Sequence, residues 1–336
     1  MRILLWVTVA VSGLWFGYWW VGSGAVERAT NDWFTQTAAT GLVARNESIH
    51  VAGFPNRFDL TINGLELRDP SSGIGWKAPF VQVFAMTWKP WHLIAALPHT
   101  QVITANNQSV TLESTKLMGS IKVHPNSLFG LDAINIEAFD VALASDAGWT
   151  LGIEKAFFAT VEDTTRANTH RIGLSITNIR PDPAVQKALT QTNLPDVATG
   201  LHLDAFAALS APLDKAAAET QPQLLQLDIA DATATWGDLH IAAKGMLKAG
   251  DDGLAVGEVA IKIDGWRLLP KVLAAIGLVK PEVAPTIERA MQVIAAQTGD
   301  LTVLNVVLKC ADGWMSLGPL PLGPAPRFNA GPALQG

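Results

Sequence analysis

The stretch FDLTINGLELRD, residues 58–69, determines the class of fold that the sequence predicts. Apolar residues alternate with polar ones on both sides of Asn63-Gly64, but in opposite parity: Phe58, Leu60 and Ile62 before the pair, Leu65 and Leu67 after it. Alternation with a period of two is typical of a β-strand that buries one face. The Asn-Gly pair predicts either a two-residue hairpin or a β-bulge, and either geometry returns the apolar side chains to one face.

The same change of parity recurs in two later stretches. Their apolar residues are Ile134 and Ile136 followed by Phe139, Val141 and Leu143, and then Leu227 and Ile229 followed by Ala232, Ala234 and Trp236. Because a bulge increases the twist of a strand, strands that each contain one favour a curved sheet with an apolar concave face. We expect the large apolar residues of the three stretches to form the wall of an apolar groove.

A Gly53-Phe54-Pro55 turn precedes the first of these strands. Glycine relieves the backbone there, and proline, which cannot donate a ladder hydrogen bond, favours the edge of a sheet. We expect Phe54 to pack inward and to join the groove wall.

The rest of the chain, from about Ala44, shows period-two patterns separated by turn signals. The predicted fold is mainly β (β-rich α+β), with an N-terminal transmembrane helix followed by a curved, bulged antiparallel sheet and a few covering helices. Strands are predicted over residues 57–68, 80–88, 116–124, 133–144, 149–161, 171–179, 201–210, 224–236, 239–247, 257–264 and 301–310. Helices are predicted over residues 183–192, 213–220, 266–278 and 281–297.

The N-terminal residues 3–26 carry no charge between Arg2 and Glu27. As a helix rising about 1.5 Å per residue, this stretch is long enough to cross a hydrocarbon core of about 30 Å. Tyr18, Trp19 and Trp20 predict a membrane interface near its far end, while Arg2 and the α-amino group keep the leading end in the cytoplasm. We expect a single-pass inner-membrane anchor with the body in the periplasm.

The alternative is a cleaved signal peptide, because the small residues Ser23-Gly24-Ala25 form a suitable cleavage site. The uncharged stretch exceeds the usual apolar core of a signal peptide, about 7–15 residues, and this favours the uncleaved anchor.

The predicted organisation is a signal-anchor helix over residues 1–27, a β-rich periplasmic body over 28–320 and a Pro/Gly-rich tail over 321–336. A weak internal similarity joins GIGWKAPFVQVFAMTWKPWHLIAALP to GLAVGEVAIKIDGWRLLPKVLAAIG. In each, a strand leads to a tryptophan, Trp91 or Trp266, and then to a short apolar helix. The similarity predicts two similar halves, about residues 44–180 and 200–318.

Charge and cysteine content limit the partners. The net charge is −6 and the pI is about 5.6, so a polyanion is repelled on average and we expect no nucleic-acid partner. The single cysteine, Cys310, cannot form an intrachain disulfide. Its apolar surroundings predict a buried thiol, with a reactive thiol or an intermolecular bridge as the alternative.

Residues that could carry catalysis or hold a metal are sparse. The 7 histidines are scattered without metal-ligand spacing, and the sequence has no phosphate loop, nucleophile elbow or dinucleotide fingerprint. The acidic pairs Glu162-Asp163 and Asp251-Asp252 sit beside turn residues, while His202 and Asp204 alternate away from the apolar side of their strand. We therefore expect no enzyme activity, no metal and no cofactor.

Three segments, together with the apolar N-terminus, resemble a known family. VAGFPNRFDLTINGLELRDP, WGDLHIAAKGMLKAGDDGLAVGEVAIKIDGW and LKCADGWMSLGPLPLG are similar to the uncharacterised bacterial family called domain of unknown function 2125. The Gly-Phe-Pro strand followed by Leu-x-Leu-x-Asp is more distantly similar to AsmA-like periplasmic proteins. That likeness implies a membrane-anchored, β-rich protein linked to outer-envelope lipid homeostasis, and it brings no catalytic residues.

Two functions remain open from the sequence. The first is a non-enzymatic, membrane-anchored periplasmic protein that binds or passes lipid acyl chains along the apolar face of its sheet in envelope maintenance. The second is a structural scaffold or assembly factor of the cell envelope, whose core is filled by its own helices and takes no ligand. The expected partners are the inner membrane and a phospholipid or other envelope lipid, and the sequence identifies no protein partner.

Overall fold

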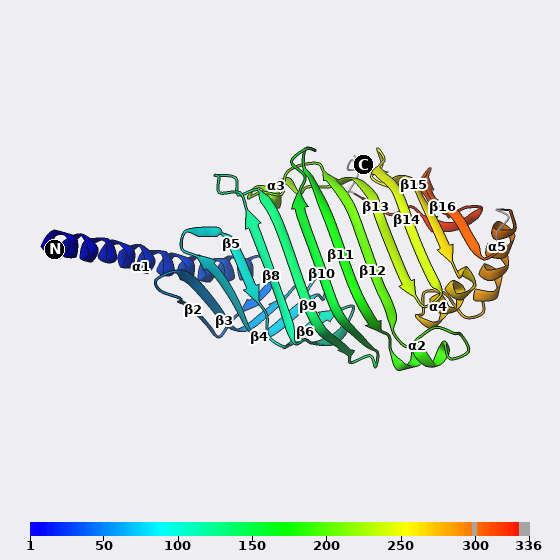
Figure 1. Cartoon of the computed structure of the whole chain (residues 1–336), viewed down its shortest axis with the longest axis horizontal. Coiled ribbons are helices and arrows are strands. Elements are labelled where there is room, and N and C mark those ends of the chain that lie inside the picture. Colours follow the sequence, from blue (N-terminus) through cyan, green and yellow to red (C-terminus); the bar gives the residue numbers. More distant parts are fainter. Residues whose placement is uncertain (298–300, 329–336) are drawn as a thin grey trace. The chain divides into compact units, whose positions relative to one another are not determined.

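The computed structural model describes residues 1–297 and 301–328, and its strands pair antiparallel (Figure 1). The predicted mainly β class with a long apolar N-terminal helix is therefore confirmed. The chain divides into two compact units. Unit 1 contains Met1–Pro125 and Asn135–Trp149, and unit 2 contains Asn126–Ile134 and Thr150–Gly336.

Helix α1 (Arg2–Ala39) opens unit 1 and is longer than the predicted segment 1–27. It is the one helix of the described residues that is long and apolar enough to cross a membrane. Ile3 and Leu14, in its first part, are 81% and 76% exposed, whereas Phe34, in its last part, is 6% exposed. Because burial of an apolar ring is favourable, Phe34 extends the helix beyond the uncharged stretch by fixing it to the sheet.

Short strands pair around one long central pair in unit 1. β3 pairs with β1 and β2 along one edge and with β4 along the other. β4 pairs with β6 near its start and with β5 near its end, β5 pairs with β8, and β6 pairs with β7, which pairs with the end of β9. The bounds are β1 (Val43–Arg45), β2 (Ser48–Ala52), β3 (Arg57–Arg68), β4 (Gly75–Met86), β5 (Lys89–Ala96), β6 (Thr100–Ala105), β7 (Gln108–Glu113), β8 (Lys116–Val123) and β9 (Leu131–Ser145).

Strand β3 changes parity without a hairpin. Gly64 adopts a φ of +60°, which glycine tolerates because it lacks a Cβ. Asn63 lies opposite Phe80 and Leu65 opposite Ala78, so the register with β4 is the same on both sides of Gly64. Ile62 and Leu65 nevertheless pack in one cluster. The single apolar face is confirmed. Neither predicted geometry occurs in this strand: β3 continues through Asn63-Gly64 without a hairpin, and its pairing with β4 contains no bulge.

Unit 2 is a meander in which each strand pairs with the next along the chain (Figure 1). Its strands are β10 (Thr150–Glu162), β11 (Thr169–Arg180), β12 (Ala198–Leu209), β13 (Leu224–Trp236), β14 (Leu239–Ala249), β15 (Ala255–Asp264), β16 (Val303–Ala311), β17 (Trp314–Leu317) and β18 (Leu320–Pro324). The parity change in β13 is a true bulge, because the register with β14 shifts between Ile229 and Ala232. The bulge predicted there is confirmed.

Helices cover one end of the unit 2 sheet. They are α2 (Pro183–Ala188), the 3-10 turn η1 (Trp266–Leu268), α4 (Leu269–Ala275) and α5 (Ala284–Gln297). The short helix α3 (Ala217–Thr220), between β12 and β13, lies away from them (Figure 1). All five lie inside the predicted helical segments. Trp266, Val272 and Met291 pack with Leu239 and Leu304 of the sheet in a buried cluster. The helix predicted after Trp91 is wrong, because that residue lies in β5, and the similarity of two halves stays a prediction.

The predicted tail, residues 321–336, is partly structured. Leu320–Pro324 forms β18, Ala325 is 5% exposed, and Phe328 packs with Cys310 and Leu247. The tail therefore closes over a second cluster of unit 2, and its residues 329–336 lie outside the described part of the chain.

Candidate functional site

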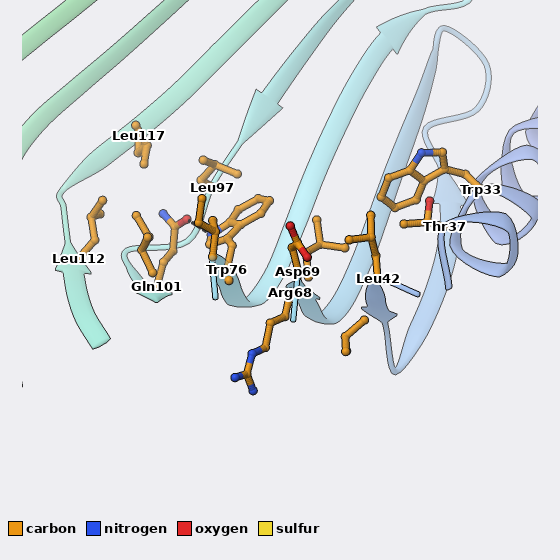
Figure 2. Close-up of a pocket in the computed structure, with 15 residues that line it drawn as sticks. Trp33, Thr37, Leu42, Arg68, Asp69, Trp76, Leu97, Gln101, Leu112 and Leu117 are labelled. Carbon is orange, nitrogen blue, oxygen red and sulfur yellow. Dashed lines mark hydrogen bonds between the residues drawn. The ribbon is translucent and has the colours of Figure 1, made fainter. Parts of the chain in front are cut away.

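An open apolar cavity of about 510 Å³ lies in unit 1, beside the last turns of α1 (Figure 2). Such a volume falls in the range of about 300–1,000 Å³ that is typical of pockets for small ligands. Figure 2 shows Trp33 and Thr37 of the helix on one side, with Leu112 and Leu117 on the other. The lining residues are Trp33, Thr37, Leu42, Val43, Leu67, Arg68, Asp69, Ile74, Gly75, Trp76, Leu97, Gln101, Ile103, Leu112 and Leu117.

Strand register brings the apolar wall of the cavity together. Leu67 of β3 lies opposite Trp76 of β4, and Trp76 lies opposite Ile103 of β6. Directly opposed residues in antiparallel strands point to the same face, so these three side chains form one row. Gln101 and Leu112 form a second pair one step along the same face.

The polar atoms of this wall are already bonded within the protein. The Trp76 Nε1 donates to Gln101 Oε1 at 2.8 Å, and Gln101 Nε2 donates to the carbonyl of Pro98 at 3.2 Å. Gln101 is only 3% exposed, whereas Trp33 is 48% exposed. What the cavity offers to a ligand is therefore apolar surface.

Charged residues stand at the rim. Hydrogen bonds from Ser71 and Ser72 lower the pKa of Asp69 to about 2, so its carboxylate is ionised and already occupied. Arg68 is exposed, and Figure 2 shows its side chain extending away from the apolar residues. Among the described residues, no carboxylate makes an ion pair with Arg68.

The predicted wall residues of β3 divide between a filled core and the cavity. Phe58 is 7% exposed and lies against Gly22 of α1, while Ile62 and Leu65 pack in the cluster around Phe34. Leu60, opposite Val51 and Val83, is half-buried. Of these predicted residues, Leu67 lines the cavity.

The prediction that Phe54 packs inward is wrong. Its side chain is 51% exposed, on the loop between β2 and β3, and its ring contacts Phe16 and Trp19 of α1 at centroid distances of 5.6 and 5.5 Å. The Gly53 part of the reasoning holds, since its φ is +100° and a Cβ there would lie 2.8 Å from the Arg57 carbonyl.

In β9 the apolar pattern predicts the change of parity between Ile136 and Phe139, but the change occurs later, at Asp140. Asp140 adopts a φ of +50° and accepts a hydrogen bond from Thr115. Val141, after it, is buried, and Leu143 lies opposite Leu112 of the cavity wall. The Phe139 ring instead lies 5.4 Å from the Lys116 ammonium, which also pairs with Glu137. Phe139 is thus on the outer face, and its assignment to the wall is wrong.

Two other wall residues of the middle stretch are less buried than the prediction requires. Ile134, which belongs to unit 2, is half-buried, and Ile136, in unit 1, is 41% exposed. Neither lines the cavity described above.

The unit 2 residues of the predicted wall lie in or beside its filled core. Trp236 packs with the cluster under the helices, and its Nε1 donates to the carbonyl of Pro195 at 2.6 Å. Ile229 packs with the cluster under the tail, and Leu227 lies opposite Leu247 of that cluster.

Sequence reasoning missed an apolar face on β10–β12. Phe158 lies opposite Leu174, and Leu174 lies opposite Leu203, so the three share one face. All three are half-buried, and none belongs to the clusters under the helices or the tail. It also missed Trp33 and the β6–β7 hairpin of the cavity. Asn106-Asn107, both at positive φ between two alternating runs, is the signal that predicts that hairpin.

The three aromatic residues predicted at a membrane interface are placed differently from one another. Tyr18 and Trp19 turn toward unit 1, where the Tyr18 hydroxyl donates to the Thr87 carbonyl and Trp19 Nε1 to the Arg57 carbonyl, each at 2.8 Å. Trp20 is 67% exposed. Trp20 is therefore the most exposed of the three, although Tyr18 is also 48% exposed.

Among the described residues, no group of three or more His, Cys, Asp or Glu side chains is placed to hold a metal ion. His170 is 6% exposed on the apolar face of β11, and burial lowers its pKa, opposed by the charge of Glu162. His202 and Asp231 lie 3.9 Å apart on the polar face, and Asp204 is bonded to Arg171. The cavity of unit 1 is lined mainly by apolar side chains.

Comparisons with known proteins give one match. No curated protein and no solved structure matches the chain, and nothing in these comparisons supports the likeness to AsmA-like proteins. A family model described as "Uncharacterized protein conserved in bacteria (DUF2125)" matches residues 19–326, which include the cavity, most of both units and the part of α1 from Trp19 onward. The chain belongs to the DUF2125 family.

Proposed function

We propose that α1 is an uncleaved membrane anchor that holds the β-rich units in the periplasm. Support comes from the contacts of the residues that a signal peptidase would remove. Tyr18 and Trp19 donate to carbonyls of unit 1, and Ser23, within the small-residue stretch, is 8% exposed inside a continuous helix. Trp15 likewise donates to the Pro55 carbonyl, so cleavage after Ala25 would leave three backbone carbonyls of unit 1 without these donors.

The direction of the anchor follows from charge. Arg2 and the α-amino group are positive at the leading end, whereas Glu27, Arg28 and Asp32 together carry one negative charge after the apolar stretch. The positive end favours the cytoplasm. A reporter that is active only outside the cytoplasm, fused after Gly336, should give full signal, and the protein should keep residues 1–26 and resist a carbonate wash. Release of a shortened protein would contradict the anchor.

The proposed activity is binding of a lipid acyl chain in the cavity of unit 1, without a chemical step. The observation that carries it is the cavity itself: about 510 Å³, lined by apolar side chains, with the buried Gln101 already satisfied by Trp76 and Pro98. A polar ligand would find few free partners on this wall, whereas an acyl chain needs none. Arg68 at the rim, without an ion-pair partner among the described residues, suits an anionic head group.

Photo-crosslinking tests this proposal in the full chain. A benzophenone amino acid at Ile103, which lines the cavity, should form a lipid adduct that mass spectrometry finds on the β6 peptide. Val102 is the matched control, because it is the adjacent residue and points to the opposite face. Equal adduct yields at the two positions would mean that lipid meets the protein without using the cavity.

A pair of substitutions separates binding from folding. Leu65→Asp places a carboxylate in the core beneath Phe34 and should cost several kcal/mol, because the buried charge has no partner. Leu67→Asp, two residues along on the same face, borders the open cavity, where water can reach the carboxylate. It should keep the fold and lose the Ile103 adduct. Collapse of both variants would favour the alternative function, a scaffold without a ligand.

That alternative has support of its own. Most of the face of β13–β16 is packed against α2, α4, α5 and the tail, apart from an open cavity of about 660 Å³ beside Ile261, Ile294 and Val306. The first half of β3 is covered by α1. A self-filled core therefore accounts for these parts, and the crosslinking experiment decides between the two functions for the cavity.

A further inference from the structure

Two loops of unit 1 are fixed to the apolar part of α1. One is the loop over residues 53–56, between β2 and β3, and the other is the turn over residues 87–88, between β4 and β5. Trp15 Nε1 donates to the Pro55 carbonyl at 2.9 Å, and Tyr18 donates to the Thr87 carbonyl at 2.8 Å. The two loops are also joined to each other, because Thr87 N donates to the Asn56 carbonyl at 3.0 Å.

The position of these contacts along α1 sets their depth in a membrane. If an upright helix enters the hydrocarbon at Arg2, a core of about 30 Å at about 1.5 Å per residue ends near Gly22. Trp19 then lies about 5 Å, and Trp15 about 10 Å, inside that boundary. Figure 1 shows the first part of α1 extending beyond β2 and β3 of the same unit. The loops meet the helix at the level of the outer acyl chains.

The chemistry of the loops fits that depth. Backbone carbonyls in lipid need a donor from the protein, because water is absent. Those of Pro55, Arg57 and Thr87 each accept a hydrogen bond from an aromatic side chain of α1. This gives a reason why the donors are Trp and Tyr: their rings are apolar enough for lipid, and each carries one polar hydrogen.

Apart from Asn56, the exposed side chains of these two loops and the residues beside them are apolar or basic. Phe54 is 51% exposed, Trp88 is 50% exposed and Met86 is 42% exposed. Lys89 follows Trp88 and is exposed, which places a long basic side chain where it can reach lipid phosphates. Exposed aromatic residues flanked by Lys or Arg are typical of segments at a membrane interface.

We propose that residues 53–57 and 86–88 form a wedge that inserts into the outer leaflet of the membrane next to α1. The partner is a phospholipid bilayer, the same one that α1 spans under the proposed function, on which this inference rests. The wedge makes unit 1 a part that touches the membrane directly and is not merely tethered to it. Phe54 and Trp88 occupy the acyl region, and Lys89 reaches the phosphates.

Depth-dependent quenching tests the wedge. The full chain with Cys310→Ala and Phe54→Cys is labelled with a nitrobenzoxadiazole dye and reconstituted in vesicles of phosphatidylcholine and phosphatidylglycerol. Phosphatidylcholine with a nitroxide near the head of its acyl chain should remove most of the emission. Pro70→Cys is the matched control: it is exposed, does not line the cavity and lies beyond the other end of β3, about 36 Å away at about 3.3 Å per residue, so its label should be unaffected.

The outcomes separate the wedge from the anchor. A chain that resists carbonate but whose label at position 54 is quenched no more than the label at position 70 overturns the wedge alone. Release of the chain by carbonate overturns the anchor, and the wedge with it. Because Phe54→Cys removes ring contacts with α1, Trp88→Cys provides a second label on the wedge, and the expected quenching is the same.

Discussion

Phe34→Ala is the sharpest test of how α1 is held to unit 1. The ring is 6% exposed and packs with Leu65, Ala78 and Val81 of β3 and β4. Replacing a buried Phe by Ala typically costs about 3–5 kcal/mol. The cavity beside this cluster allows its neighbours and water to relax, so we expect the lower end, about 3 kcal/mol. At about 1.4 kcal/mol per tenfold, β3 amides that exchange by local opening should then exchange about a hundred times faster.

The assay is hydrogen exchange mass spectrometry of β3 peptides from the full chain in lipid nanodiscs. Trp33→Ala is the matched control, because Trp33 is the adjacent aromatic residue but is 48% exposed. Its loss removes an edge-to-face ring contact with Phe34, worth about 1 kcal/mol, and should accelerate exchange only about fivefold. Equal acceleration in both variants, or no change with Phe34→Ala, would refute the role of Phe34 as the contact that fixes the helix.

Three further predictions concern other parts of the chain. Burial lowers the pKa of His170 below 6.5, so the folded protein is most stable above about pH 6.5 and loses stability at lower pH, where the unfolded chain takes up a proton on this histidine. Between pH 7.5 and 5 the melting temperature should therefore fall less steeply for His170→Leu than for the unchanged protein, and parallel curves would contradict this. Cys310 is buried, and burial also raises the pKa of its thiol, so a maleimide should label it in urea but not in the native protein. Cys310→Ala should lower the stability by about 1–2 kcal/mol, and rapid labelling of the native protein would exclude a buried thiol. Gly22→Ala places a Cβ 2.7 Å from the Phe58 ring and should loosen the packing of α1 on the sheet. Exchange should then be faster at Val51 of β2, whose amide donates to Glu27 of α1, whereas Gly17→Ala, with nothing within 4 Å, should not change it; equal exchange in the two variants would mean that the Phe58 ring moves aside freely.

The sequence predicts the strands of this fold well where they are long. Each predicted strand coincides with an observed one, because a long run of alternating apolar and polar residues rarely arises outside a strand. The short strands β5, β6 and β7 were not predicted, because the alternation of apolar and polar residues is weak over only six to eight residues. In addition, the Trp-His-Leu-Ile run of β5 resembles an apolar helix as much as a strand.

Parity changes are visible in the sequence, but their geometry is not. In β13 the pattern marks a true bulge, whereas in β3 the same pattern arises from one glycine at positive φ with an unchanged register. In β9 the change occurs at Asp140, so Phe139 falls on the outer face. From the sequence alone, an apolar residue beside the parity change can be assigned to either face of the strand. Its contacts with neighbouring strands determine which face it occupies.

The candidate site was predictable only in part. The alternation in β3 predicts that Leu67 lies on the apolar face. It does not indicate which other segment of the chain packs against that face. Phe34 and its neighbour Trp33 are two adjacent aromatic residues in a polar stretch of helix, and nothing nearby in the sequence indicates that Phe34 is the one that covers Leu65. The cavity exists because α1 ends near Thr37 and leaves the last residues of β3 uncovered.

The length of α1 has a consequence for exchange kinetics. If α1 spans the membrane as proposed, with the hydrocarbon ending near Gly22, the helix rises about 22 Å from there to Thr37 at the cavity, at about 1.5 Å per residue. A bilayer lipid that is to occupy the cavity must therefore leave the membrane almost entirely before its chain reaches Trp33. Spontaneous loading then proceeds no faster than lipid desorption, and its activation energy should be that of extracting an acyl chain into water, unless a second protein shields the chain over that distance.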